Sequence, residues 1–249
     1  MPVDRTKDIS AELESAPLVE PATEPVVLPK AEFFQVMFEI ESKHVASMLP
    51  PALHPTDPPT MTFTAIRAVD SPFGTFTVIR TRIGCRAGVR PRGYVVGGYI
   101  DNPDAGHEIA EKWAFPKKAA KTSLRKGYHA IVAEVVLDGR TILTTSLVDP
   151  KPLAGSEIQF AANMHLARVR RNGSTVPRLV QVDPELTIHR ASSGRPRVDA
   201  FEAEAWGDAR IKPVYPVSAW HMVADIELPR IRYLCDPNVT ALQGTEKIG

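Results

Sequence analysis

The chain has few cysteines: Cys85 and Cys235 are the only two in 249 residues, and they are far apart. This usage argues against a disulfide framework and a zinc ribbon, and it suggests a reducing, cytoplasmic location. No stretch approaches 18 consecutive apolar residues, so we expect no membrane span and no membrane partner. The first ten residues also lack the basic and apolar regions of a signal peptide.

The chain also has little net charge: 30 Lys and Arg and 29 Asp and Glu residues give a formal charge of +1 at pH 7. No global field therefore draws the chain to nucleic acid. Five arginines gather between Arg80 and Arg92 without interleaved aromatic residues, and we interpret them as a solvated face rather than a nucleic-acid patch. The histidines form no metal-ligand motif and the glycines no nucleotide-binding loop, so we expect no metal and no cofactor.

The composition is that of a globular protein with a sizeable core, since 43% of the residues are hydrophobic. Residues 1–29 hold five prolines among acidic and small residues. Such a segment cannot form a core alone, and we interpret it as an extended Pro-rich arm, draped over the domain or a neighbouring subunit, or loose. Residues 30–249 then form one domain.

Strand signals dominate that domain. The stretches TMTFTAIRA (60–68) and GTFTVIRTRI (74–83) alternate in the period of a strand, and Asp138-Gly139 joins two strand-like runs as a hairpin turn. One helix is expected over 102–113, with Asn102 as its cap. Many short strands with few helices predict an α+β fold, mostly an antiparallel sheet that is closed or nearly closed.

Two stretches invite a functional interpretation that the residues do not support. Ser218, His221 and Asp225 in SAWHMVAD could suggest a catalytic triad. Triad members are usually distant in sequence, so we expect these three residues to be structural. Gly97 and Gly98, inside a predicted strand, indicate a bulge or a close approach of another segment.

The stretch WAFPKKAAK (113–121) places Lys117 and Lys118 side by side, behind a proline and among apolar residues. The ordinary interpretation of such a pair is a solvated turn. The alternative is a reactive lysine, which must first lose its proton. An ordinary lysine pKa near 10.4 leaves only about one amine in 2,500 neutral at pH 7. A neighbouring ammonium and apolar surroundings both favour the neutral amine.

The surroundings of the pair favour the second interpretation. YIDNPDAGHEIAEKWAFPKK (99–118) resembles the core signature of the acetoacetate decarboxylase family, and SAWHMVADIELP (218–229) is similar to that family's C-terminal segment. The stretches DGRTILTTSLV and FAANMHLARV fall between them in the expected order. The likeness runs from about Glu32 to Pro229.

This resemblance implies a cone-shaped, mostly antiparallel β-barrel around an apolar cavity, and assembly as a homo-oligomer. It implies that Lys117 is the Schiff-base nucleophile and that Lys118 is its charged neighbour. Glu111 matches a family glutamate whose role could be only to support the loop. An iminium formed by the lysine is the electron sink that the loss of CO₂ from a β-keto acid requires.

The sequence departs from the family pattern at three pocket positions. Ala31 stands where the decarboxylase has an arginine, and two family glutamates fall at Phe63 or Thr64 and at Val78. Arg80 and Arg82 lie two apart on a strand and therefore share a face with each other. If that face is inward, they form a carboxylate clamp; if it is outward, they are solvated.

Two classes of function follow. The first is a lyase that forms a Schiff base with a small keto acid and decarboxylates a β-keto acid, or performs a related aldol or dehydration reaction. The second is a non-catalytic binding or accessory protein on the same barrel, because the fold alone does not imply activity.

Overall fold

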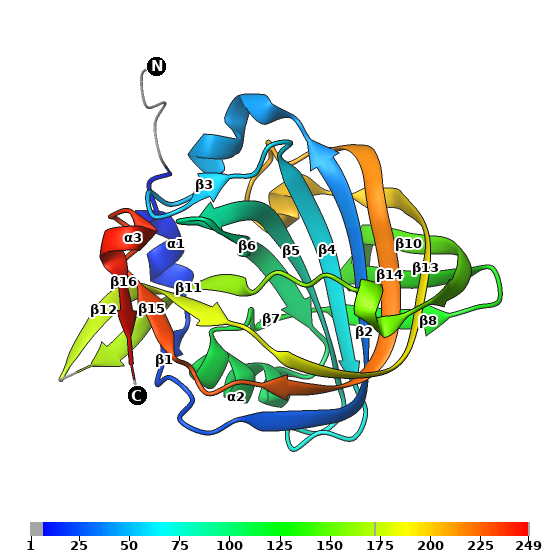
Figure 1. Cartoon of the computed structure of the whole chain (residues 1–249), viewed down its shortest axis with the longest axis horizontal. Coiled ribbons are helices and arrows are strands. Elements are labelled where there is room, and N and C mark those ends of the chain that lie inside the picture. Colours follow the sequence, from blue (N-terminus) through cyan, green and yellow to red (C-terminus); the bar gives the residue numbers. More distant parts are fainter. Residues whose placement is uncertain (1–6, 172, 249) are drawn as a thin grey trace.

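The structure, a computed structural model, describes residues 7–171 and 173–248 (Figure 1). The first six residues of the expected N-terminal arm therefore lie outside the described residues. Within the described ranges, no helix is long and apolar enough to cross a membrane.

The described chain is rich in strands and has few helices. The α-helices are α1 (Ser10–Ser15), α2 (Pro103–Trp113) and α3 (Ala241–Gly244), and the short 3-10 helices are η1 (Ser42–Met48), η2 (Gly155–Glu157) and η3 (Ala203–Trp206). The strands are β1 (Leu18–Val19), β2 (Val26–Ile40), β3 (His54–Pro55), β4 (Thr60–Ala68), β5 (Phe76–Ala87), β6 (Arg90–Ile100), β7 (Lys118–Ala119), β8 (Lys121–Lys126), β9 (Ala130–Leu137), β10 (Arg140–Leu153), β11 (Asn163–Arg171), β12 (Ser174–Val182), β13 (Glu185–Phe201), β14 (Pro213–Leu228), β15 (Tyr233–Cys235) and β16 (Thr245–Lys247).

The strands form one curved, mostly antiparallel sheet in the order β16-β15-β12-β11-β6-β5-β4-β2-β14-β13-β10-β9-β8. The mostly antiparallel prediction is confirmed, whereas a closed barrel is not, because no backbone ladder joins β8 to β16 in the described part of the chain. The sheet nevertheless curls far round, since the Thr122 hydroxyl of β8 donates to the Thr77 carbonyl of β5 at 2.7 Å.

Successive side chains of the central strands point to opposite sides of the sheet. In β4 and β5 the side chains on both sides are buried. Phe34 and Ile79 belong to one apolar cluster, whereas their chain neighbours Phe33 and Val78 belong to a second. Helix α2 packs into the second cluster with Ile109 and other apolar side chains.

The segment before β2 is not extended throughout. It contains α1, and β1 pairs in parallel with β11 through Leu18 and Arg168. The Glu20 amide donates to the carbonyl of Glu111 at 2.9 Å, so this segment lies across both β11 and α2. Strand β2 begins at Val26, before the expected start of the domain at residue 30, and the division between arm and domain stays a prediction.

Local signals for α2 and for the hairpin are confirmed. The Asn102 side chain accepts hydrogen bonds from the backbone amides of Asp104 and Ala105 and so caps α2. Asp138 and Gly139 both have positive φ, 51° and 79°, as a two-residue turn between β9 and β10 requires.

Candidate active site

The two lysines lie where α2 meets the sheet. Helix α2 ends at Trp113. Its C-cap residue, Ala114, has a φ of 58° in the left-handed region, a conformation that costs an alanine about 1–2 kcal/mol. Phe115 and Pro116 follow, and β7 then pairs in parallel with β6, with Lys118 opposite Tyr99. The helix end and this short ladder together fix the backbone on both sides of Lys117.

Lys117 and Lys118 line a cavity of about 150 Å³, which we call the Lys117 cavity. An apolar cavity of about this size holds a molecule such as benzene, so six or seven non-hydrogen atoms fit. Its walls come from the N-terminal segment, β6, the residues after α2 and β11. The lining residues are Glu12, Ser15, Ala16, Pro17, Tyr94, Val95, Val96, Gly97, Gly98, Ala114, Phe115, Pro116, Lys117, Lys118, His165 and Leu166.

Gly97 and Gly98 lie at a bulge and at a close approach of another segment, the two features that the sequence indicated. The register between β5 and β6 shifts next to Gly97, which is a bulge. A Cβ atom at Gly98 would lie 2.7 Å from Cγ of Pro116 and 3.0 Å from Cγ of Arg80. The lysine segment and Arg80 can approach β6 this closely only because the residue is glycine.

Both lysine side chains are exposed in the single chain. The apolar burial that the sequence reasoning invoked to favour a neutral amine is therefore not provided by the described residues alone. Positive charge is present at this wall, because Lys117 and Lys118 both line the cavity and the buried Arg80 contacts the lining residue Phe115.

Arg80 is 1% exposed, so its strand position faces the interior and the outward alternative is wrong for this residue. It does not line the cavity itself. Its guanidinium carbon lies 4.4 Å from the ring centroid of Phe115, which does. Its Nε and Nη1 atoms are buried without a hydrogen-bond partner. Burial, and then the charge of Arg82, lower the pKa of Arg80 to about 9, so the group stays charged at neutral pH.

Arg82 is also buried, but its guanidinium is satisfied by neutral oxygens. It donates to the Ala161 carbonyl at 2.9 Å, to Asn163 Oδ1 at 3.0 Å and to Gln35 Oε1 at 2.5 Å. These bonds give Arg82 a structural role. The expected solvated face of five arginines is therefore wrong for Arg80 and Arg82, whereas Arg86 and Arg90 are exposed as expected.

His165 of β11 is a site residue that the sequence reasoning missed. Its Nδ1 lies 2.7 Å from the Ala114 carbonyl, so Nδ1 carries the hydrogen that it donates. The ring stacks on Phe115 at 5.0 Å. Burial, and then Arg80, lower the pKa of His165 to about 3, so the ring is neutral. His165 thus holds the turn that leads to Lys117. The stretch NMHLARV alternates as a strand, but nothing local marks its histidine.

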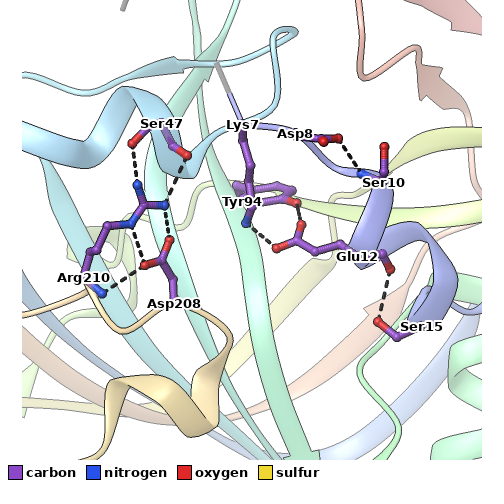
Figure 2. Close-up of polar contacts among 9 residues, drawn as sticks. All are labelled: Lys7, Asp8, Ser10, Glu12, Ser15, Ser47, Tyr94, Asp208 and Arg210. Atoms are coloured by element: carbon purple, nitrogen blue, oxygen red, sulfur yellow. Dashed lines mark hydrogen bonds and ion pairs between the residues drawn. The ribbon is translucent and has the colours of Figure 1, made fainter. Parts of the chain in front are cut away.

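Glu12 and Tyr94 are also site residues that the sequence reasoning missed. The Tyr94 hydroxyl donates to Glu12 Oε2 at 2.9 Å, and Lys7 forms an ion pair with Glu12 Oε1 (Figure 2). Tyr94 comes from β6 and Glu12 from α1, so the contact ties the N-terminal segment to the cavity wall. No local pattern in the Pro-rich segment could have placed Glu12 there.

Glu111 is not brought to the Lys117 cavity. It lies on the exposed side of α2, where it contacts His107 Nε2 at 3.2 Å. The residues of SAWHMVAD form no triad either: His221 Nε2 lies 3.0 Å from Glu32 Oε2, while Asp225 contacts His189. The bond to His221 is the main reason that the pKa of Glu32 falls to about 2.

Within the described ranges, no group of three or more His, Cys, Asp or Glu side chains is arranged to hold a metal ion. The described residues at the cavity offer two amines, a carboxylate, a phenol and a neutral imidazole, and a buried guanidinium contacts the lining residue Phe115.

The chain matches the family described as acetoacetate decarboxylase over residues 15–237. It therefore belongs to the acetoacetate decarboxylase family, as the two lysine-bearing and C-terminal motifs indicated. This family match supports an enzyme of the lyase type. Among curated proteins, the search found no match.

Solved structures with a similar fold share little sequence with the chain. The acetoacetate decarboxylase of Legionella pneumophila has a TM-score of 0.73 and 20% identity, over 85% of this chain and 87% of that one. The enduracididine biosynthesis enzyme MppR, complexed with pyruvate, has a TM-score of 0.66 and 14% identity, over 86% and 91%. An acetoacetate decarboxylase-like enzyme from Sphingomonas wittichii has a TM-score of 0.60 and 14% identity, over 85% and 95%. At these identities the likeness is one of fold.

Proposed function

We propose that the protein is a lyase whose Lys117 forms a Schiff base with a small keto acid. The observation that carries the proposal is the placement of Lys117, beside Lys118, in the wall of a cavity of about 150 Å³. A keto acid of six or seven non-hydrogen atoms matches that size. The iminium then withdraws electrons from the neighbouring carbon, as decarboxylation, aldol and dehydration steps all require.

Arg80 is the group that we assign to the carboxylate of the keto acid. Two donor atoms of its buried guanidinium lack partners, and it is absent from the ion pairs of the described residues. A charge-assisted hydrogen bond to such a group contributes about 1.5–3 kcal/mol. Phe115 lies between Arg80 and the cavity, so a carboxylate either displaces this ring or is stabilised through it by charge.

The neighbours of Arg80 support this assignment. Thr64 is its cross-strand partner and Val78 lies two residues away on the same strand. The resemblance places family glutamates at or next to these two positions. Because these positions hold neutral residues, Arg80 has no carboxylate partner within the described ranges, and we assign that role to a substrate carboxylate.

The proposal is tested by borohydride reduction of the protein with a panel of keto acids, including acetoacetate and pyruvate, followed by measurement of the intact mass. A covalent adduct of the expected mass supports the lyase. Saturable binding without an adduct for any keto acid would contradict it and would favour the binding or accessory protein instead. Pyruvate belongs in the panel because MppR is described in complex with it.

Lys118 is expected to act through its charge. Replacing it with Met removes an ammonium next to Lys117, so the neutral amine forms only at higher pH and the alkaline rise of the pH–rate profile moves upward. The measurement is the pH dependence of the rate of adduct formation. An identical profile in Lys118→Met and the unaltered protein would show that Lys118 has no such role.

Acetoacetate is expected to be a poor substrate. The resemblance implies pocket groups of the decarboxylase at Ala31, at Phe63 or Thr64, and at Val78, and all of these residues are neutral and buried. We expect kcat/KM for CO₂ release from acetoacetate to lie below about 10⁴ M⁻¹s⁻¹, the low end of ordinary enzymes. A value above that limit would mean that the absent groups are not needed.

A further inference from the structure

We propose that Glu12, supplied by α1, takes the proton from the substrate carbon next to the Schiff base and returns it. This inference rests on the Schiff-base role proposed above for Lys117. It assigns a catalytic role to the N-terminal segment, which the sequence alone presents as an arm.

Among the described residues that line the Lys117 cavity, Glu12 is the one Asp or Glu. The two strand positions at which the resemblance expects glutamates carry neutral residues in this chain. A carboxylate is therefore present at the cavity, but it comes from a different element. Glu12 and Lys117 line the same cavity, and the proposal requires a ligand bound to Lys117 to reach the Glu12 carboxylate.

Two contacts orient the Glu12 carboxylate (Figure 2). The Tyr94 hydroxyl donates to its Oε2 at 2.9 Å, and Tyr94 is 1% exposed. Burial, and then Glu12, raise the pKa of Tyr94 well above 10, so the phenol stays a hydrogen-bond donor. Tyr94 is thus a positioning residue, which holds Glu12 without taking part in the proton transfer itself.

Lys7 reduces the electrostatic repulsion between the Glu12 carboxylate and the carboxylate of a keto acid. Its ammonium forms an ion pair with Glu12 Oε1, and it lies 5.6 Å from the centroid of the Tyr94 ring. The pair is close to neutral overall, so the substrate carboxylate is not repelled. The Glu12 side chain remains 29% exposed, which leaves it accessible to a ligand in the cavity.

The other titratable groups at the cavity are less suited to this step. Nε2 of His165 bears a lone pair, but the atom is buried from solvent and the ring is a very weak base. Lys118 is adjacent to the nucleophile along the chain, and its positive charge is the property that the Schiff base requires of it. Glu12 is left as the accessible base.

The step balances within the site. The proton leaves the carbon next to the iminium carbon and binds a Glu12 oxygen. The electron pair of the broken C–H bond becomes the C=C bond of an enamine, and the C=N π pair becomes the nitrogen lone pair. Return of a proton from Glu12 to the same carbon reverses these changes. In D₂O, each cycle replaces a hydrogen by deuterium.

The test follows exchange of the methyl protons of pyruvate in D₂O by ¹H NMR, together with borohydride trapping of the same samples. Glu12→Gln preserves shape and a hydrogen-bond acceptor for Tyr94. We expect it to keep the adduct within two-fold and to slow exchange by about 100-fold or more, the usual contribution of a general base. Tyr94→Phe is expected to keep the adduct and slow exchange by about 10-fold, the effect of losing one hydrogen bond that positions Glu12.

Glu14→Gln is the matched control, because Glu14 lies on the same helix but is exposed and outside the cavity lining. It should exchange pyruvate protons as the unaltered protein does. Trapping with unimpaired exchange in Glu12→Gln overturns the role of Glu12 alone, as does a loss of exchange in Glu14→Gln of the same size. Absence of an adduct in the unaltered protein overturns the Schiff-base proposal, and this one with it.

Discussion

Lys117→Ala is expected to abolish borohydride trapping of keto acids and to reduce turnover by roughly 10⁴-fold or more, as in other enzymes that lose their nucleophile. The alanine has no amine to form the iminium, so the electron sink is lost rather than weakened. Because the Lys117 side chain is exposed, its removal should change the free energy of unfolding by no more than about 0.5 kcal/mol. Trapping and thermal unfolding are measured on the same preparation.

Lys121→Ala provides the control for that experiment. Lys121 is exposed on β8, four residues beyond Lys117, and does not line the cavity. It should be trapped and should turn over as the unaltered protein does. An adduct of undiminished yield in Lys117→Ala would place the reactive amine elsewhere and remove the basis of the proposed function.

Arg80→Met is expected to weaken keto-acid binding by about 10- to 100-fold, which corresponds to the loss of one charge-assisted hydrogen bond. Binding of a neutral ketone of the same size, such as 2-butanone, should change little. The same variant should unfold at a higher temperature, because it removes a buried charge that forms no ion pair among the described residues and has two nitrogens without a hydrogen-bond partner. Replacing buried ionic groups by apolar ones often adds about 1–4 kcal/mol of stability.

Arg80→Lys separates charge from geometry in this prediction. It retains the positive charge, so it should retain part of the preference for keto acids over neutral ketones. The account of Arg80 is contradicted if Arg80→Met binds both ligands as the unaltered protein does, or if it loses affinity for both equally. A lowered unfolding temperature would show that the guanidinium stabilises the fold through contacts other than hydrogen bonds.

The parts of the fold that local chemistry determines could be predicted from the sequence. Asn102 caps α2 and Asp138-Gly139 turns the β9–β10 hairpin because each needs only its immediate neighbours. Closure of the sheet could not be predicted, because it depends on where the two end strands lie after the fourteen others have paired and twisted. The short α1 was missed because prolines and acids obscure a helix that tertiary contacts stabilise.

In the candidate site, too, features set by the local sequence could be predicted and features set by the whole topology could not. The Pro-Lys-Lys sequence identified Lys117, and its position in a cavity wall supports that assignment. The alternation of side chains along β5 predicted that Arg80 and Arg82 share a face, but it did not determine whether that face is inner or outer. Packing of β11 and Phe115 against this face makes it the inner one. Glu12 and His165 reach the cavity from distant elements, so their place depends on the whole topology. Glu111 matched a family position, yet the orientation of α2 leaves it on the exposed side.

Peptide mapping of the reduced adduct tests the central claim most directly. The protein is reduced with borohydride in the presence of the keto acid that gives the largest adduct, then digested, and the modified residue is located by fragmentation mass spectrometry. The account predicts one modified amine, at Lys117, with Lys118 unmodified. Modification at Lys118, or at a lysine outside the Lys117 cavity, would contradict it.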